Sequence, residues 1–549
     1  MPDVVVVGSG HNALVAACYL AREGLDVEVV ERDTVLGGAV SSVERFPGYL
    51  VDRGSSLHVM IRHTGIVEEL GLTDAGLTYL DCDPWGFYPV PDAPGGGIAF
   101  WTDLERTRES ISQVCGSRDA AAYRDFVLDW ASRNDRIFAA FQAPPTVSNL
   151  GRSLWGVGRS TGLPGVEIAR QFMSPADALL DASFRDERLR TALSWLGAQA
   201  GPPAHEVATA DLVGWNAMLH RRAPGRPVGG SGALTAALRR RLESYGGRVR
   251  LGDAVARIET RAGQVCGVRT QGGVRLRARA VLAGCHIATT LDLVAHALDG
   301  RLGGERSRLR VGNGLGMAIR LGTTALPDYP GAPPQVHHGM VLAAPDRFAL
   351  RRAYGRYLAG ETPEEPPVLV MASSSLDPTI APPGRHNITV WGQWHPYRLA
   401  GDARWEDIGE QEGDKLVAAL ERVAPGFAAT VEHRHIQTPL DLERELDLRH
   451  GNVMHLEMGL DAMFAWRPLS DLSGYRGPLD CLYVCGASTH PGGGVFGASG
   501  RSAARVMLAD LRPGLRPAAL REVSGRTRDA LTAGAAAVMR ARMPWPPRR

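Results

Sequence analysis

Residues 4–31, VVVVGSGHNALVAACYLAREGLDVEVVE, decide the fold of this chain. Val4–Val7 predicts a buried strand, the run after it a helix, and Val27–Val30 a second strand. A glycine-rich segment, here called the first glycine turn (residues 8–13), joins the first strand to the helix. Glu31 follows the second strand. Strand, glycine turn, helix, strand and acid in this order predict a dinucleotide-binding βαβ unit.

Each residue type of the first glycine turn suits a dinucleotide for a physical reason. Gly8 permits the tight turn, Gly10 lets the backbone approach a pyrophosphate, and Ala13 is small enough for close packing of helix on strand. The helix N-terminus offers free N–H groups to the phosphates. Glu31, 23 residues after Gly8, can accept hydrogen bonds from ribose hydroxyls. The predicted cofactor-binding residues here are Gly8, Gly10, His11, Asn12, Ala13, Glu31, Arg32, Gly37, Gly38 and Ala39.

A second glycine-rich segment lies near the C-terminus. Leu482–Val484 predicts a strand, and the second glycine turn (residues 486–500) carries six glycines and leads into a predicted helix over 499–510. A helix N-terminus at this place can point partial positive charge at a ligand. We therefore expect both glycine turns to contact one ligand, the second through Gly486, Gly494, Val495 and Phe496.

A third glycine cluster, residues 229–234, is not preceded by a buried strand, because RRAPGRP comes before it. It predicts a tight loop that starts a helix, followed by strands and a hairpin at residues 271–273. No other strand, glycine turn, helix and acid unit occurs in the sequence. The chain is therefore expected to lack its own NAD(P)H domain. If the bound dinucleotide takes electrons from a substrate, it would pass them on to oxygen, a quinone or another protein.

Composition narrows the class of protein. The chain has 549 residues, 44% hydrophobic and 22% charged, which excludes wholesale disorder, collagen and coiled coil. A net charge of +2 gives no electrostatic reason to expect nucleic acid as a partner. The N-terminus begins with an apolar strand and lacks a basic signal-peptide region, and no apolar run reaches the length of a membrane span. These features predict a cytoplasmic protein.

Taken together, these segments resemble the phytoene desaturase superfamily, and within it most closely the bacterial carotene ketolase-like branch. The resemblance extends from residue 4 to about residue 510. Besides the two glycine turns, the matching stretches are FQAPP (141–145), SPADALLDASFRDERLRTAL (174–193), GRPVGGSGALTAAL (225–238), LDPTIAPPGRH (376–386) and GNVMHLEMGLDAMFAWRPL (451–469).

The resemblance implies FAD as the cofactor, with the backbone near Val255 at the adenine. It also implies an α/β fold, in which a discontinuous Rossmann-like FAD-binding domain of the glutathione reductase and amine oxidase type carries an inserted mixed α+β substrate domain. The expected ranges are 1–95, 225–300 and 446–511 for the FAD-binding domain, 96–224 and 301–445 for the substrate domain, and 512–549 for a basic tail.

The activity that the resemblance implies is an FAD-dependent oxidation of the dehydrogenase, desaturase or ketolase type. Hydride would pass to the flavin from a largely apolar small molecule, a carotenoid or another secondary metabolite. Two alternatives stay open on the same fold. One is a non-catalytic binder of a prenylated or apolar ligand, and the other is an amine oxidase, which would need an aromatic cage facing the flavin.

Two histidines are candidate catalytic residues. His58 follows the first glycine turn, where it could tune the flavin or carry a proton, and His490 lies in the second. The segment WGQWHPY (391–397) could line an aromatic channel or form a plain half-buried strand. His455 and Glu457 would share one face of a strand as an acid–base pair or as surface residues. No cluster with metal-ligand spacing is found, so no metal is predicted.

The tail, residues 512–549, contains nine arginines and a stretch that could form an amphipathic helix. One interpretation is an element that associates with a membrane surface or a partner protein. The other is a solvated terminal helix with a frayed, proline-rich end.

Overall fold

A computed structural model describes the chain except residues 147, 153–155, 157–164, 299–306 and 513–549. Met1–Ala503 form one compact unit and Ala504–Arg549 a second. Beyond Arg512, the predicted basic tail and its amphipathic helix lie outside the described residues.

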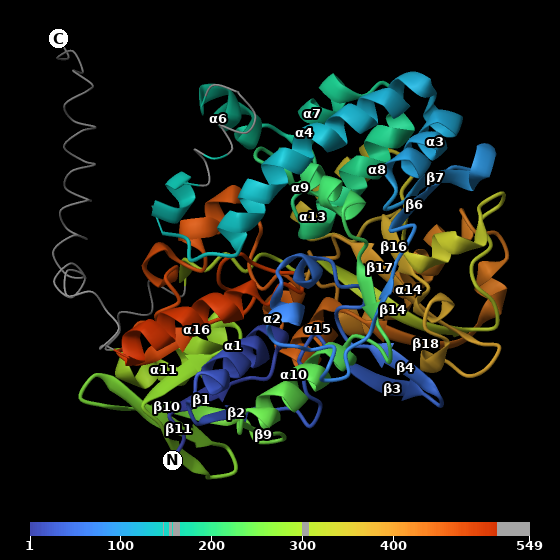
Figure 1. Cartoon of the computed structure of the whole chain (residues 1–549). Helices are drawn as coiled ribbons and strands as arrows, with labels where there is room; N and C mark the ends of the chain where they lie inside the picture. The colour runs from blue at the N-terminus through green and yellow to red at the C-terminus, as the bar shows by residue number, and fades with distance from the viewer. Residues whose placement is uncertain (147, 153–155, 157–164, 299–306, 513–549) are drawn as a thin grey trace. The chain divides into compact units, whose positions relative to one another are not determined.

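The βαβ unit predicted at the N-terminus forms the middle of a parallel sheet (Figure 1). β1 (Val4–Val7) pairs with β2 (Val27–Val30) on one side and β13 (Ala280–Ala283) on the other. With β9 (Arg248–Arg250) and β19 (Leu482–Val484) the strand order is β19-β13-β1-β2-β9. Every residue of β1 is a buried valine, as expected for a parallel strand that is covered on both faces.

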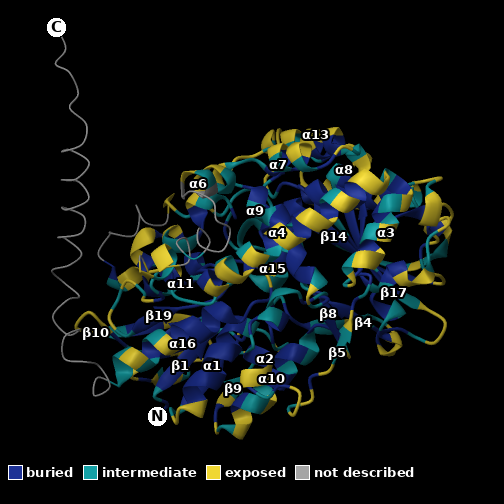
Figure 2. Cartoon of the chain, turned by 45° about the horizontal axis from the view of Figure 1, so that its top comes forward, coloured by how far each residue is buried: buried dark blue, intermediate teal, exposed yellow. Residues whose placement is uncertain are grey.

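This strand order fixes where a ligand can bind. The chain passes from β1 to β2 on one side, whereas β13 and β19 lie on the other, which opens a crevice beyond the carboxyl ends of the strands. Both glycine turns begin at this edge, because one follows β1 and the other follows β19. Figure 2 shows β1 and the helix after it, α1 (His11–Arg22), deeply buried.

A second, mixed sheet has the order β18-β14-β17-β16-β15-β6-β7. Its strands alternate between two cores, as period-two side chains do. In β16, Val368 and Val370 pack in the core that includes α14 (Trp405–Glu421), whereas Leu369 packs in the core on the other face. The strands are β18 (Val431–Gln437), β14 (Gly316–Thr323), β17 (His386–Gln393), β16 (Val368–Met371), β15 (Met340–Ala343), β6 (Gly86–Pro89) and β7 (Gly97–Phe100).

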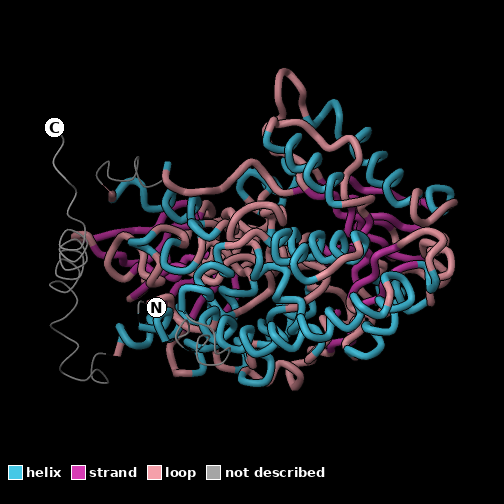
Figure 3. The backbone as a smooth tube through the Cα atoms, turned by 90° about the horizontal axis from the view of Figure 1, so that it is seen from above, coloured by secondary structure: helices cyan, strands magenta, loops and turns pink. Residues whose placement is uncertain are grey.

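A group of helices covers one face of the second sheet, where Trp195 and Leu193 share a core with Trp85 and Leu342. In Figure 3 the strands gather into two groups, which correspond to the two sheets. The helices of this region are α3 (Leu104–Cys115), α4 (Ser117–Phe141), α6 (Gly165–Met173), α7 (Ala176–Ser183), α8 (Glu187–Gly197) and α9 (Ala210–Gly214).

The strands of the parallel sheet lie within the ranges expected for FAD binding, and those of the second sheet lie within the ranges expected for the substrate domain, with one exception. The division into two domains stays a prediction, because Met1–Ala503 form one compact unit. β6, which lies inside the range 1–95 assigned to FAD binding, pairs with β15 in the second sheet. The buried apolar run at Phe87 belongs to that sheet's core. The other elements are β3 (Ser42–Phe46), β4 (Tyr49–Asp52), β5 (Tyr79–Asp81), β8 (Gly225–Pro227), β10 (Val255–Arg261), β11 (Gln264–Thr270), β12 (Arg275–Arg277), α2 (Ile66–Glu69), α10 (Gly232–Ser244), α11 (Ile287–Val294), α13 (Arg347–Leu358), α15 (Pro439–Leu446) and α16 (Ala498–Leu511).

Candidate functional site

The first glycine turn is held by Glu31 at the end of β2. The backbone N–H and the hydroxyl of Ser9 donate to Glu31 Oε2 at 2.7 and 2.8 Å, and the N–H of Asp33 donates to Oε1 at 2.9 Å. Glu31 therefore stands where the sequence predicts it and also ties the turn after β1 to the loop after β2. Oε2 accepts two of these hydrogen bonds and Oε1 accepts one, so Oε1 has a lone pair left for a hydroxyl donor such as a ribose.

The two glycine turns meet at one cavity, here called the inner cavity, of about 320 Å³. It lies at the carboxyl edge of the parallel sheet, where the strand order predicts a crevice. Of the predicted cofactor residues, it is lined by Gly10, His11, Asn12, Gly37, Ala39, Gly486, Gly494 and Val495.

Opposite the glycine turns, the second sheet supplies the other wall of the inner cavity. Met340 on β15 and Leu369 and Met371 on β16 give this wall an apolar surface. Thr389 and Trp391 continue it on β17 at period-two spacing. Among the described residues that line the cavity none is Asp or Glu, and Arg320 on β14 is the charged side chain.

The residues of the inner cavity fit the predicted dinucleotide. A Cβ added at Gly10 would meet no atom within 4 Å, so the chain leaves space beside this backbone. No side chain caps the N-terminus of α1, and the buried Oδ1 of Asn12 has no hydrogen-bond partner. Free donors at a helix N-terminus suit phosphate oxygens, and the orphan amide oxygen suits a hydroxyl donor.

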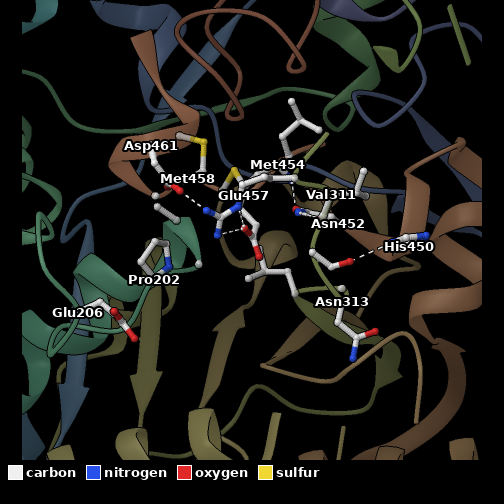
Figure 4. Close-up of a pocket in the computed structure, with 18 of the residues that line it drawn as sticks. Pro202, Glu206, Val311, Asn313, His450, Asn452, Met454, Glu457, Met458 and Asp461 are labelled. Atoms are coloured by element: carbon white, nitrogen blue, oxygen red, sulfur yellow. Dashed lines mark hydrogen bonds and ion pairs between the residues drawn. The ribbon is translucent and has the colours of Figure 1, made fainter. Parts of the chain in front are cut away.

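An outer cavity of about 1280 Å³ adjoins the inner one and carries charged side chains. In Figure 4, Glu457 and Asp461 point toward the same guanidinium, that of Arg310. Nε of Arg310 donates to Glu457 Oε2 at 2.8 Å. Leu315 and Met454 line both cavities and so mark their junction.

His58 does not line the inner cavity, and its catalytic role stays a prediction. The ring is fully buried, with Nδ1 2.8 Å from the Tyr79 hydroxyl and Nε2 2.8 Å from the Ser231 hydroxyl. Burial lowers the pKa of His58 to about 3, so it is neutral at pH 7. With both nitrogens engaged, His58 joins three segments of the chain rather than reaching a ligand.

His490 also lies outside the lining of both cavities, and its catalytic role likewise stays a prediction. Its Nε2 lies 3.0 Å from the carbonyl of Ala140, and burial lowers the pKa of His490 to about 4. The neighbouring Phe496, predicted to contact the cofactor, packs in an aromatic cluster against Phe138, with the ring centroids 6.0 Å apart.

Other predicted cofactor residues lie behind or beside the cavity. Ala13 packs closely against the backbone of Gly284. A Cβ added at Gly284 would lie only 2.5 Å from the Cβ of Ala13. Arg32 is exposed and donates to the carbonyl of Glu445. Val255 begins β10 and packs against a core cluster. Gly8 and Gly38 adopt positive φ of 92° and 56°, which explains glycine there without a ligand contact.

Two further predictions change with the structure. His455 and Glu457 do not share a strand face, because their segment is irregular; His455 lines the inner cavity and Glu457 the outer. The aromatic segment divides in the same way, with Trp391 at the inner cavity and Trp394 at the outer. No group of three or more potential metal ligands occurs among the described residues.

Sequence reasoning missed Arg320, the charged residue of the inner cavity. The signal was present, since Arg320 is the one charged residue in the otherwise apolar or small segment GMAIRLGT of β14, which is buried throughout. An arginine inside such a strand is rarely buried without a reason.

Comparison with known proteins supports the assignment of a dinucleotide-binding oxidoreductase. Residues 6–70 match the NAD(P)-binding Rossmann-like domain family. The chain is 32% identical to the rat (Rattus norvegicus) pyridine nucleotide-disulfide oxidoreductase domain-containing protein 2, over 93% of this chain and 94% of the relative. It is 27% identical to the hydroxyneurosporene desaturase of Cereibacter sphaeroides, over 93% and 98% of the two chains.

A solved oxidoreductase from Methanosarcina mazei has the same fold, with a TM-score of 0.61 at 17% identity over 92% of this chain and 99% of the other. In the described part of the chain, no helix has the length and apolar character needed to cross a membrane. From its two glycine turns, its two sheets and these full-length relatives, the chain belongs to the phytoene desaturase superfamily of FAD-dependent oxidoreductases.

Proposed function

We propose that this chain binds FAD in the inner cavity and uses it to oxidise a largely apolar small molecule. The observation that carries the proposal is that two glycine turns, remote in sequence, line one cavity whose facing wall is an apolar sheet. A flat redox group between the turns would have one side open to a substrate that lies against this sheet.

The residues that would hold FAD follow from the lining. Gly10, His11 and Asn12 would take the phosphates, with Gly37 and Gly494 close to the ring system. When bound, FAD supplies an acceptor for a hydride equivalent. Since the chain needs only to orient the substrate and keep the site dry, few acid or base groups are required.

The chain's own side chains perform that orientation. Met340, Leu369 and Met371 exclude water from the inner cavity and favour a substrate whose reacting carbon is part of an apolar body. Burial lowers the pKa of His11 to about 4, so the imidazole that lines the cavity is neutral at pH 7. It lies 3.0 Å from Asn12 Nδ2 and adds polarity without charge.

A carotenoid or another apolar secondary metabolite could pack against this apolar wall. The similarity to a hydroxyneurosporene desaturase supports a substrate of this class. The substrate would arrive through the outer cavity and pass Leu315 and Met454. Oxygen or a quinone would reoxidise the flavin. A quinone would reach the protein from a membrane surface.

The amine oxidase alternative is disfavoured by the inner cavity. It needs an aromatic cage, and among the described lining residues Trp391 is the one aromatic side chain. The guanidinium of Arg320 on the same wall would also repel an ammonium group.

The proposal is tested with the purified full-length chain. We expect a yellow protein with about one FAD per chain, bleached by dithionite and, without oxygen, by an apolar dehydrogenation substrate but not by putrescine. A colourless protein that takes up no FAD on reconstitution would refute flavin binding. Bleaching by amines alone would refute the substrate class.

A further inference from the structure

Arg320 is a buried cation with an unfilled hydrogen-bonding position. Its side chain is 3% exposed and lines the inner cavity. Nη1 donates to the hydroxyl of Thr389 at 2.9 Å, and Nη2 donates to the carbonyl of Arg53 and to Gln437 Oε1, both at 3.2 Å. The buried Nε has no partner.

The charge of Arg320 is not neutralised by a carboxylate contact within the described structure. Asp52 attracts it at longer range, but this carboxylate forms its own ion pair with Arg226 at 3.1 Å. Glu445 also attracts it and forms an ion pair with Arg45, while Arg45 itself repels it. Burial lowers the pKa of Arg320 to about 10, so the guanidinium stays charged at pH 7.

The inner cavity offers this cation no carboxylate, because no Asp or Glu is found among its described lining residues. The sheet wall of the same cavity also includes Met340, Leu369, Met371 and Trp391. A buried charge whose N–H groups are incompletely satisfied is costly, and an oxygen acceptor brought in by a ligand would reduce that cost. A carboxylate does so best, through charge-assisted hydrogen bonds.

We propose that Arg320, with Thr389 beside it, binds an oxygen-bearing head group of the substrate, with a carboxylate preferred, while the apolar body of the substrate lies along Leu369 and Met371. The inference rests on the proposed function and narrows it. The substrate is then an amphipathic molecule with an acidic or carbonyl end. A pure hydrocarbon would leave the guanidinium without an acceptor.

The test compares three ligands that share one apolar chain: decanoate, decanol and decylamine. Calorimetric titration of the holoenzyme measures their affinities, and visible absorption gives the FAD content of each preparation. In the wild type we expect decanoate to bind at least about tenfold more tightly than decanol, and decylamine most weakly. In Arg320→Met we expect decanoate affinity to fall about tenfold and decanol affinity by less than about threefold.

Two more variants make the result specific. Arg320→Lys keeps the charge but loses the planar fork, so it should retain part of the preference and decide the question if Arg320→Met does not fold. The matched control is Arg347→Met, since Arg347 is also buried and charged but lies outside both cavities; it should keep the wild-type order of affinities.

The inference is overturned if the wild type binds decanoate and decanol alike, or if Arg320→Met weakens all three ligands equally. It is also overturned if this variant leaves decanoate binding intact and shifts the flavin midpoint potential, because Arg320 would then act on the cofactor. A wild type without FAD refutes the proposed function, whereas the head-group preference, measured on the same preparation, decides the role of Arg320 separately.

Discussion

The two glycine turns line the same cavity, yet the glycines in each have different structural roles. At Gly10 in the first turn, an added Cβ would meet no atom within 4 Å. In the second turn, a Cβ added at Gly493 would lie 2.3 Å from Met454 Sδ, and one at Gly500 would lie 2.0 Å from the carbonyl of Asn12. The first turn leaves room for a ligand at Gly10, whereas several glycines of the second turn allow neighbouring chain segments to pack closely. A high density of glycines therefore does not by itself identify ligand contacts.

The largest effect is expected from Gly500→Ala. The new Cβ would meet the backbone of α1 at Asn12 and Ala16, which cannot move without separating the two helices. We expect the free energy of unfolding to fall by about 3 kcal/mol, with a clear drop in the thermal midpoint. Gly355→Ala is the control, because Gly355 lies in α13 with open space around it and should be unchanged or slightly more stable. Equal midpoints for Gly500→Ala and the wild type would contradict this helix contact.

Gly10→Val tests whether the first glycine turn leaves its open space for a ligand. The Cβ meets no protein atom within 4 Å, so we expect stability within about 1 kcal/mol of the wild type, but the side chain fills space in the inner cavity. The affinity for FAD should fall about 30-fold or more, measured by fluorescence titration of the apoprotein. Gly355→Val supplies a control with the same substitution far from the cavity lining. Unchanged FAD affinity in Gly10→Val would remove the first turn from the cofactor site.

Substitution of His58, which follows the first glycine turn, should affect stability and its pH dependence rather than turnover. Because burial lowers its folded-state pKa from 6.5 to about 3, only the unfolded chain takes up a proton at His58 as the pH falls below 6.5. Keeping His58 neutral therefore costs stability between these values, by up to about 1.4 kcal/mol per pH unit. His58→Gln should lose less stability than the wild type between pH 6.5 and about 4.5, by about 1 to 2 kcal/mol.

The control for this variant is catalytic. Since the ring of His58 lies outside the cavity lining, flavin reduction at pH 7.5 should change by less than about threefold in His58→Gln. A large loss of the reduction rate with normal FAD content would instead show that His58 is a catalytic residue.

The parts of the fold that depend on local pattern could be predicted from the sequence. The valines of β1 and the acid after β2 predict the parallel sheet, and the strand before each glycine turn predicts that both turns reach its carboxyl edge. Partners set by packing could not be predicted. Tyr79 and Ser231 reach His58 from 21 and 173 residues away, and no pattern near His58 encodes either contact.

The same limit applies to the inner cavity. That Arg320 faces the glycine turns depends on the register between β14 and β17, which pairs Arg320 with Thr389 and is set by the whole sheet. Whether a glycine is open or packed is likewise a property of its neighbours in space. The sequence predicts where the ligand-binding edge lies, but not which side chains of the second sheet face it.

The smallest effect is expected from Gly494→Ala, where the two kinds of glycine meet. Gly494 lines the inner cavity as Gly10 does, but it has φ of 98°, and an added Cβ would lie 3.5 Å from the Phe496 ring, an ordinary contact. We expect about 1 kcal/mol of backbone strain and about a threefold loss of FAD affinity, by the same titration. A loss as large as that of Gly10→Val would mean that the second turn holds the cofactor as closely as the first. Reduced stability with unchanged FAD affinity would mean that its glycines serve packing alone, and that the first turn and the second sheet define the site.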